Sequence, residues 1–198
     1  MLDPRVVNER IYTHNALPLL ARRDTCQARF NVDGLVFEGN RSTDWPSSTY
    51  VQFFRSGIVE AVDTGMLRSR EQKNEIRTLN VETEIFEHLP GYLRLLKELG
   101  VDAPFAIMLS LLHVRGFTHA GRKTQFATAT NSVPVFDRDV VRLPEIVLEG
   151  EDLEKPIQSL LEPLMHALWQ AGGWTACPRY ENGSYAPNTR KGESCSPS

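Results

Sequence analysis

The segment from Tyr50 to Asp63, YVQFFRSGIVEAVD, constrains the fold more than any other part of the sequence. Two apolar-rich runs flank Ser56-Gly57, and glycine readily adopts the positive φ that a tight primed turn requires. The segment therefore predicts an antiparallel β-hairpin with a two-residue turn. We expect its faces to carry Val51, Phe53, Ile58 and Val62 on one side, and Tyr50, Phe54, Val59 and Ala61 on the other. Because both faces mix apolar with polar residues, partial cover on each side is expected.

Three further stretches have strand character. Residues 26–37 alternate apolar and polar residues around Asp33-Gly34, which predicts another hairpin. Residues 103–116, APFAIMLSLLHVRG, are apolar at both alternating sets of positions, which is typical of a strand in the middle of a sheet. Residues 136–150 predict a later strand region, and Pro144 within it belongs at an edge or a break because proline donates no ladder hydrogen bond.

Two amphipathic helices are predicted. The first begins at Asn80 as N-cap and ends at Gly100, with Pro90 bending or dividing it. Its apolar stripe is spaced by three and four residues: Val81, Ile85, Leu89, Leu93, Leu96 and Leu99. The second helix begins at Asp152 and stops at Gly172-Gly173.

The remaining segments predict little regular structure. Residues 65–78 are charged, 116–133 are polar and rich in small residues, and both read as irregular connections. We expect residues 1–24 to form an N-terminal arm that either docks as a short helix or stays extended. Residues 25–173 form one domain, and residues 174–198 form a disordered tail. The predicted fold class is α+β, a mostly antiparallel sheet of hairpins packed with the two helices.

Composition limits the cellular setting. The net charge is −3 and the pI is near 6.0, which gives no general attraction for nucleic acid. No run approaches the roughly 18 apolar residues of a membrane span, and charged residues interrupt the first ten positions, where a signal peptide would need an apolar run. The three cysteines match no metal-binding spacing. A reduced, cytoplasmic protein without a membrane partner is expected.

One set of residues could be drawn as a catalytic metal site. His113 and His119 follow the predicted central strand, and Asp137 and Asp139 precede the later one. Together they could hold a divalent ion for hydrolysis, but their spacing matches no zinc signature. The alternative interpretation, which we favour, is that His113 ends a strand at the surface and that Asp137 and Asp139 form a turn with local ion pairs.

Other reactive patterns are missing from the sequence. Cys26 has neither a glycine-rich elbow nor a helix N-terminus beside it, and Cys177 and Cys195 fall in the predicted tail. No serine lies in a GxSxG context, and the glycines form no nucleotide-binding loop. Five aromatic residues of the hairpins could stack nucleic-acid bases but alternate with valines as core residues do: Phe30, Phe37, Tyr50, Phe53 and Phe54. We therefore predict no catalytic, cofactor-binding or metal-binding residue and no cofactor.

Four motifs together resemble a known domain. They are FNVDGLVF, YVQFFRSGIVEAVD, LPGYLRLLKELGVDAPFAIMLSLLHVRGF and FDRDVVRLPEIVLE, and they extend from about Arg29 to Glu149. The combination resembles the carboxy-terminal domain of bacterial proteins, often described as ATP-binding or helix-turn-helix proteins, that carry a Schlafen-type AlbA DNA-binding domain at their amino end. Fewer than thirty residues precede Arg29, so we expect no such domain in this chain. The resemblance implies a fold family and transfers no catalytic residue.

The functional expectation follows from these points. We expect a non-enzymatic accessory, sensory or interaction module of a nucleic-acid-binding regulator, with a protein partner or a second copy of itself. Nucleic acid would be reached only through a separate domain or partner. Two alternatives remain open: a metal-assisted hydrolase or nuclease that uses the two histidines and two aspartates, and a direct binder of single-stranded nucleic acid through the hairpin aromatics.

Overall fold

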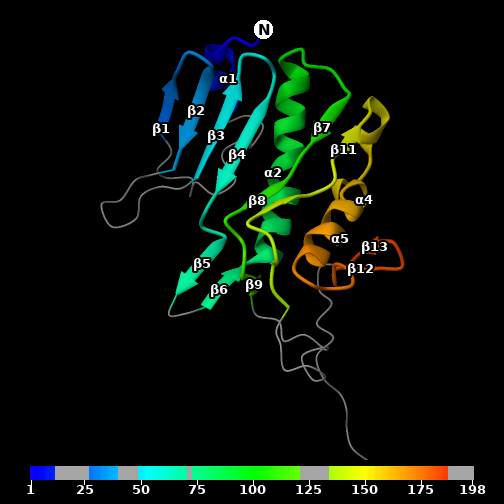
Figure 1. Cartoon of the computed structure of the whole chain (residues 1–198). Coiled ribbons are helices and arrows are strands. Elements are labelled where there is room, and N and C mark those ends of the chain that lie inside the picture. Colours follow the sequence, from blue (N-terminus) through cyan, green and yellow to red (C-terminus); the bar gives the residue numbers. More distant parts are fainter. Residues whose placement is uncertain (12–26, 40–48, 71–72, 121–133, 187–198) are drawn as a thin grey trace, which may run out of the picture.

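The computed structural model describes residues 1–11, 27–39, 49–70, 73–120 and 134–186. The fold is α+β, as predicted, with mostly antiparallel sheets of hairpins and a few helices, one of them long (Figure 1). The sheet β1–β4 lies at one end of the molecule, and the C-terminal helices lie beside the other half of the long helix.

The four-stranded sheet is a hairpin meander with the order β1-β2-β3-β4. Its strands are β1 (Gln27–Phe30), β2 (Gly34–Glu38), β3 (Thr49–Phe54) and β4 (Val59–Asp63). All neighbours are antiparallel. On β2 and β3 one face carries the buried residues Leu35, Phe37, Val51 and Phe53, and the other carries the buried residues Val36 and Gln52.

The β3–β4 hairpin has a longer turn than predicted. Phe53 pairs with Val59, and the Phe54 amide bonds to the Ile58 carbonyl, so Arg55, Ser56 and Gly57 form a three-residue loop. Gly57 has the expected positive φ, +91°, but in the αL-type position of this longer loop. The extra residue shifts the register by one. Val59 and Ala61 therefore share the face of Val51 and Phe53, whereas Val62 pairs with Tyr50 on the opposite face.

Helix α1 (Pro4–Arg10) shows that the start of the predicted arm docks as a short helix. The Asp3 carboxylate accepts a hydrogen bond from the Arg5 amide and so caps the N-terminus of the helix. Val7 and Ile11 are fully buried against the inner face of the sheet. The rest of the predicted arm, residues 12–24, lies outside the described residues.

Helix α2 (Thr78–Glu98) is a single helix that continues through Pro90. It begins two residues before the predicted N-cap, Asn80, and ends before Gly100, whose φ is +80°. Residues of the predicted stripe pack against the larger core cluster. The buried surface is wider than that stripe, however, because Tyr92 and Leu95 pack under the β-sheet. The helix is therefore shared by two hydrophobic clusters.

Residues 65–78 are more regular than predicted. Strands β5 (Leu67–Arg70) and β6 (Lys73–Ile76) form an antiparallel hairpin, and β9 (Thr118–His119) adds to β6 in parallel. Few apolar residues mark these strands: among the residues of this stretch whose burial is described, Met66 and Ile76 are the buried hydrophobic ones, and Thr78 is buried as well. Residues 121–133 of the second predicted connection lie outside the described residues.

The predicted central strand is two short strands, each with one neighbour. β7 (Phe105–Ile107) pairs with β11 (Ile146–Leu148), and β8 (Ser110–Leu112) pairs with β10 (Val140–Arg142). Pro144 lies in the break between β10 and β11, as predicted. The inner side chains are buried, but Met108 and Leu112 on the other side are exposed. The prediction of a strand covered on both faces is wrong, because the helices cover one side only.

The last predicted helix is divided into three parts. They are the 3₁₀ helix η1 (Gly150–Glu154) and the helices α4 (Ile157–Leu160) and α5 (Glu162–Ala171). Asp152 bonds to the Glu149 amide within η1 and does not begin the main helix. Pro163 lies in the first turn of α5, where a missing amide hydrogen has no cost.

The predicted disordered tail is wrong for residues 174–186. Strands β12 (Tyr180–Glu181) and β13 (Ser184–Tyr185) form a small hairpin there, and Cys177 and Tyr180 are buried. The segment lacks apolar periodicity because it is held by aromatic rings and polar contacts. Residues 187–198 lie outside the described residues.

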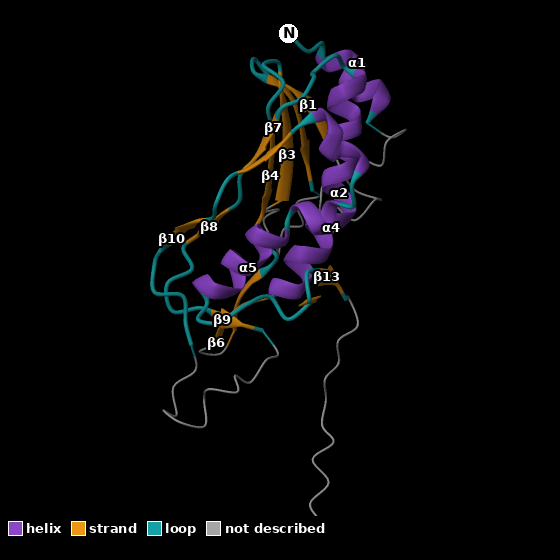
Figure 2. Ribbon diagram, turned by 90° about the vertical axis from the view of Figure 1, so that its right-hand side faces the viewer, coloured by secondary structure: helices purple, strands orange, loops and turns teal. Residues whose placement is uncertain are grey.

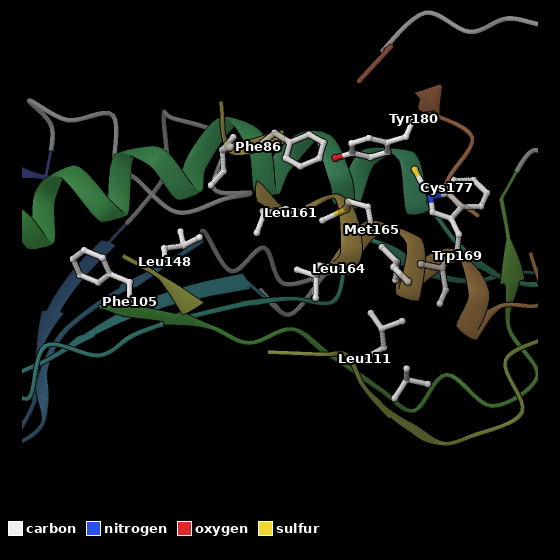
Figure 3. Packing of buried hydrophobic residues seen from close by; sticks show 14 of the residues in the cluster. Phe86, Phe105, Leu111, Leu148, Leu161, Leu164, Met165, Trp169, Cys177 and Tyr180 are labelled. Atoms are coloured by element: carbon white, nitrogen blue, oxygen red, sulfur yellow. The ribbon is translucent and has the colours of Figure 1, made fainter. Parts of the chain in front are cut away.

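The larger core lies between α2, the C-terminal helices and the short strands. Figure 3 shows Leu164 and Met165 of α5 between Leu111 of β8 and α2, with Phe105 and Leu148 of the β7–β11 pair further along the same cluster. Leu161, Leu164, Met165 and Leu168 are completely buried. At about 25 cal/mol per Å² of apolar surface, this burial is the main source of stability. None of the described helices has both the length and the apolar character needed to cross a membrane.

Gly34 is required because the backbone of Phe53 in the neighbouring strand passes too close to leave room for a side chain. A Cβ atom there would lie 2.0 Å from the Phe53 carbonyl oxygen, and the φ of Gly34 is +155°. We expect Gly34→Ala to lower the free energy of unfolding by about 3 kcal/mol, measured by urea denaturation. Gly183→Ala is the matched control: its φ is +74° but no atom lies within 4 Å of the added Cβ, so about 1 kcal/mol is expected. Equal losses would contradict this steric argument.

Candidate functional site

A buried carboxylate is the centre of the polar interior. Glu82, in the second turn of α2, is completely inaccessible to solvent. Its Oε1 accepts a short hydrogen bond from Trp169 Nε1 and a weaker one from Cys177 Sγ at 3.4 Å. Arg179 Nε lies 3.6 Å from Oε2, which gives the carboxylate an opposite charge. A charge this deep is tolerated only when it is paired in this way.

The same contacts attach the C-terminal segment to the helices. Arg179 Nη1 donates to the Thr83 and Tyr185 hydroxyls, both at 3.0 Å. The Cys177 amide donates to His166 Nδ1 at 2.9 Å, and the Tyr180 hydroxyl donates to the Gln158 carbonyl at 2.6 Å. The Arg179–Tyr185 bond lies within the segment, and each of the other three joins residues 177–185 to α2, α4 or α5. Glu82 with its partners Trp169, Cys177 and Arg179, which we call the Glu82 cluster, therefore holds the C-terminal segment against the helices.

The Cys177 thiol is not a nucleophile in this setting. Burial, followed by the charge of Glu82, raises the pKa of Cys177 to about 12. Catalytic cysteines need the opposite shift, because the thiolate is the reactive form. The side chain is only 2% exposed. Cys177 is therefore a core residue that donates a weak hydrogen bond to Glu82.

His119 occupies a second buried polar position, next to Trp169. Its ring stacks on the Trp169 indole with centroids 4.6 Å apart. Nδ1 lies 2.5 Å from the Thr78 hydroxyl and Nε2 lies 3.3 Å from the Trp169 carbonyl, which can only accept, so Nε2 carries the hydrogen. Burial lowers the pKa of His119 from 6.5 to about 4. The ring is neutral at pH 7 and both nitrogens are occupied, so it is not available as a base.

The structure separates the residues predicted as an alternative metal site. His113 Nδ1 lies 3.3 Å from Asp139 Oδ2 at the exposed end of β8, and Asp137 is an exposed neighbour of Arg138. His119 is buried under α5 beside Thr78. Among the described residues these four form no metal-binding group. The local ion pairs match the favoured interpretation of His113 and the two aspartates.

A different trio gathers on α2. Glu84, Glu87 and His88 each offer one ligand atom, and these atoms lie within 4.8 Å of one another. Carboxylate and imidazole are common ligands of divalent metals. His88 Nε2 is also 3.2 Å from Glu84 Oε2, the usual geometry of an i,i+4 ion pair on a helix. This pairing accounts for the arrangement, so we assign it no metal.

A surface groove of about 510 Å³ runs between α2 and the η1–α4 segment. Its floor is apolar, and Arg94 and Lys97 lie along its rim with Glu154 and the Lys155–Asp152 pair. None of its polar lining residues is buried. Specific small-molecule sites hold a few fixed polar groups that converge on the ligand, and this groove has none.

The exposed side of the short strands is the clearest surface feature. Five apolar side chains share it: Ala106, Met108, Leu112, Val140 and Val147. We call this set the outer face. Cross-strand register places Ala106 opposite Val147 and Leu112 opposite Val140. Figure 2 shows β7, β8 and β10 along one margin of the molecule, with α2 and α4 away from that margin.

The exposure of the outer face is unusually high for apolar residues. Met108 is 73% exposed, Leu112 is 54% exposed and Val147 is 50% exposed. The alternating residues Phe105, Leu111 and Val141 point inward and are buried. Sequence periodicity detects apolar character on both sides of these strands but cannot show that only one side has a covering layer. This is why the pattern of residues 103–116 predicts cover for Ala106, Met108 and Leu112, which the structure leaves exposed.

Nothing in the sequence marks Glu82 and its partners as a buried polar cluster. A glutamate in the first turns of a helix usually faces solvent beside the helix dipole. The only available signal was the later combination of Trp169, Cys177 and Arg179, and no pattern links it to Glu82, which precedes Trp169 by 87 positions and Cys177 by 95.

Comparisons with protein-family models, with curated protein sequences and with solved structures found no match to this chain.

The Glu82–Arg179 pair should be important for stability. Glu82→Gln keeps an acceptor for Trp169 but leaves the Arg179 guanidinium without a counter-charge. We expect a loss of about 2 kcal/mol in the free energy of unfolding, together with faster amide hydrogen exchange in residues 177–185. Glu98→Gln, which breaks an exposed pair with Arg10, should cost less than about 1 kcal/mol. Comparable losses in the two variants would show that the buried pair has no special role.

Stability should fall in mild acid because of His119. Its pKa is lower in the folded state, so the unfolded chain binds the proton more tightly, and stability is lost as pH falls from 6.5 to about 4. The shift corresponds to roughly 3 kcal/mol. Urea denaturation across this range should show the decline in wild type and in the exposed-site control His113→Gln, but not in His119→Gln. A decline that persists in His119→Gln would assign it to other groups.

Proposed function

We propose that this chain is a non-enzymatic interaction module and that the outer face is its docking surface. One observation carries the proposal: five exposed apolar side chains lie together on one side of two short strand pairs. Contiguous apolar surface of this kind is uncommon on monomeric proteins and marks sites where another molecule binds.

The position of the outer face supports this interpretation. Each of β7, β8, β10 and β11 has one hydrogen-bonded neighbour among the described strands. Their other edges offer backbone donors and acceptors next to the apolar side chains. The inner side chains are anchored in the main core. A rigid, apolar surface with open edges is well suited to binding protein.

The character of the polar interior favours binding over catalysis. Cys177 is held as a thiol, His119 is held neutral, and Glu82 is paired and inaccessible. None of these groups can reach a substrate at the surface. Of the five hairpin aromatics, Phe37 and Phe53 are buried and unable to stack on bases, Tyr50 and Phe54 are half-buried, and Phe30 is 52% exposed.

The partner class follows from the sequence resemblance. Motifs between Arg29 and Glu149 resemble the carboxy-terminal domain of proteins with a Schlafen-type AlbA DNA-binding domain. On this basis we propose that the module serves a nucleic-acid-binding regulator and reaches nucleic acid only through that protein.

Affinity capture from the source organism tests the docking surface. Wild-type protein should retain a specific protein or a second copy of the chain, identified by mass spectrometry. Met108→Glu should lose it at least tenfold, because a charge would be desolvated at the centre of the contact. Ile58→Glu is the control, since Ile58 is 61% exposed and directly follows the β3–β4 loop. Equal capture by wild type and Met108→Glu would refute the proposal.

A further inference from the structure

We infer that the outer face binds a second copy of this chain about a twofold axis. The inference rests on the proposed function, because it names the occupant of the same surface. It is drawn from the distribution of charge and apolar side chains along the two strand pairs.

The outer face is symmetric in its apolar character. Leu109 and Leu143 lie in the middle, between the two strand pairs, with Met108 next to them on the outer face. On one side of this midpoint is the pair Ala106–Val147, and on the other is the pair Leu112–Val140. The Leu143 amide bonds to the Leu109 carbonyl at 3.0 Å and keeps the middle of the ribbon in register. A copy turned by 180° about the middle would set each apolar pair against the opposite one.

The charges differ between the two halves. Arg142 is exposed at the end of β10, opposite Ser110, and Glu145 is exposed immediately before β11. Neither has an ion-pair partner among the described residues. They lie on opposite sides of Leu143 and Pro144. A single copy therefore presents a basic and an acidic group on either side of its own midpoint.

Twofold symmetry makes this arrangement self-complementary. In an isologous interface, residue i of one copy contacts residue j of the other and the reverse contact also forms. Rotation about the midpoint brings Arg142 of each copy to Glu145 of its partner, so two ion pairs form across the axis. A parallel arrangement would oppose like charges. The same surface thus selects one orientation.

The size of the surface predicts weak association. Stable interfaces usually involve about 20–30 residues on each side, and the outer face supplies five apolar side chains with a charged rim. We expect a monomer–dimer equilibrium with a dissociation constant on the order of 10–100 µM. Association should weaken at high salt because its orientation depends on exposed ion pairs.

Sedimentation equilibrium of the full chain tests the inference. Wild type should dimerise with rising concentration, and Met108→Glu should raise the dissociation constant at least tenfold. Arg142→Glu and Glu145→Arg should each weaken the dimer about three- to tenfold, whereas the double variant should recover affinity near wild type, since both pairs are then restored in reverse. Arg94→Glu, which changes an exposed arginine on α2, is the matched control and should not alter the equilibrium. Circular dichroism verifies that each variant is folded.

The outcomes separate this inference from the proposed function. A wild-type chain that stays monomeric to about 1 mM overturns the dimer, while capture of a different protein lost in Met108→Glu would leave the docking surface intact. A dimer insensitive to Met108→Glu lies elsewhere on the molecule and also overturns the inference. Failure of the double charge reversal to restore affinity overturns the twofold pairing.

Discussion

Helix α2 is the element on which the rest of the structure depends, because it is buried on two sides at once. Tyr92 and Leu95 close the space beneath the four-stranded sheet, while Phe86, Leu93 and Leu96 belong to the larger cluster formed with α4, α5 and the short strands. Both clusters gain their hydrophobic stabilisation from contact with the same 21-residue helix. The two hydrophobic clusters are thus connected through one shared helix.

The polar interactions specify the relative positions of the helices, whereas the apolar contacts supply most of the stabilisation. Glu82, Trp169 and Arg179 join residues that are far apart in the chain, and hydrogen bonds to a charged group specify geometry more narrowly than apolar packing does. They position α5 against α2, and α5 in turn supports the inner side of β8 and β10. The exposed outer face is therefore held in place by groups buried on the far side of α5. The outer face is thus held in place from within, and the polar residues Glu82, His119 and Cys177 stay buried.

Much of the fold could be predicted, and the errors have common causes. Gly57 and Gly100 have the expected positive φ, the predicted stripe of α2 packs against the larger core cluster, and Pro144 separates two strands. The three-residue loop at Gly57 was missed because one extra residue leaves the local composition unchanged but reverses the faces of β4. Strands β5, β6 and β12 were missed because they are short and polar. The pattern of residues 103–116 predicts cover on both faces, and it is wrong for Met108 and Leu112 because alternation measures apolar character and not cover.

The sequence by itself determined the class of local structure: where hairpins turn, where the long helix ends, and which residues are apolar enough to be buried. Those properties depend on neighbouring residues, so they are readable along the chain. The tertiary structure alone decided that Glu82 is buried and that Met108 is exposed. Burial depends on which layers meet in three dimensions, and no layer among the described residues covers β7 and β8 on their outer side.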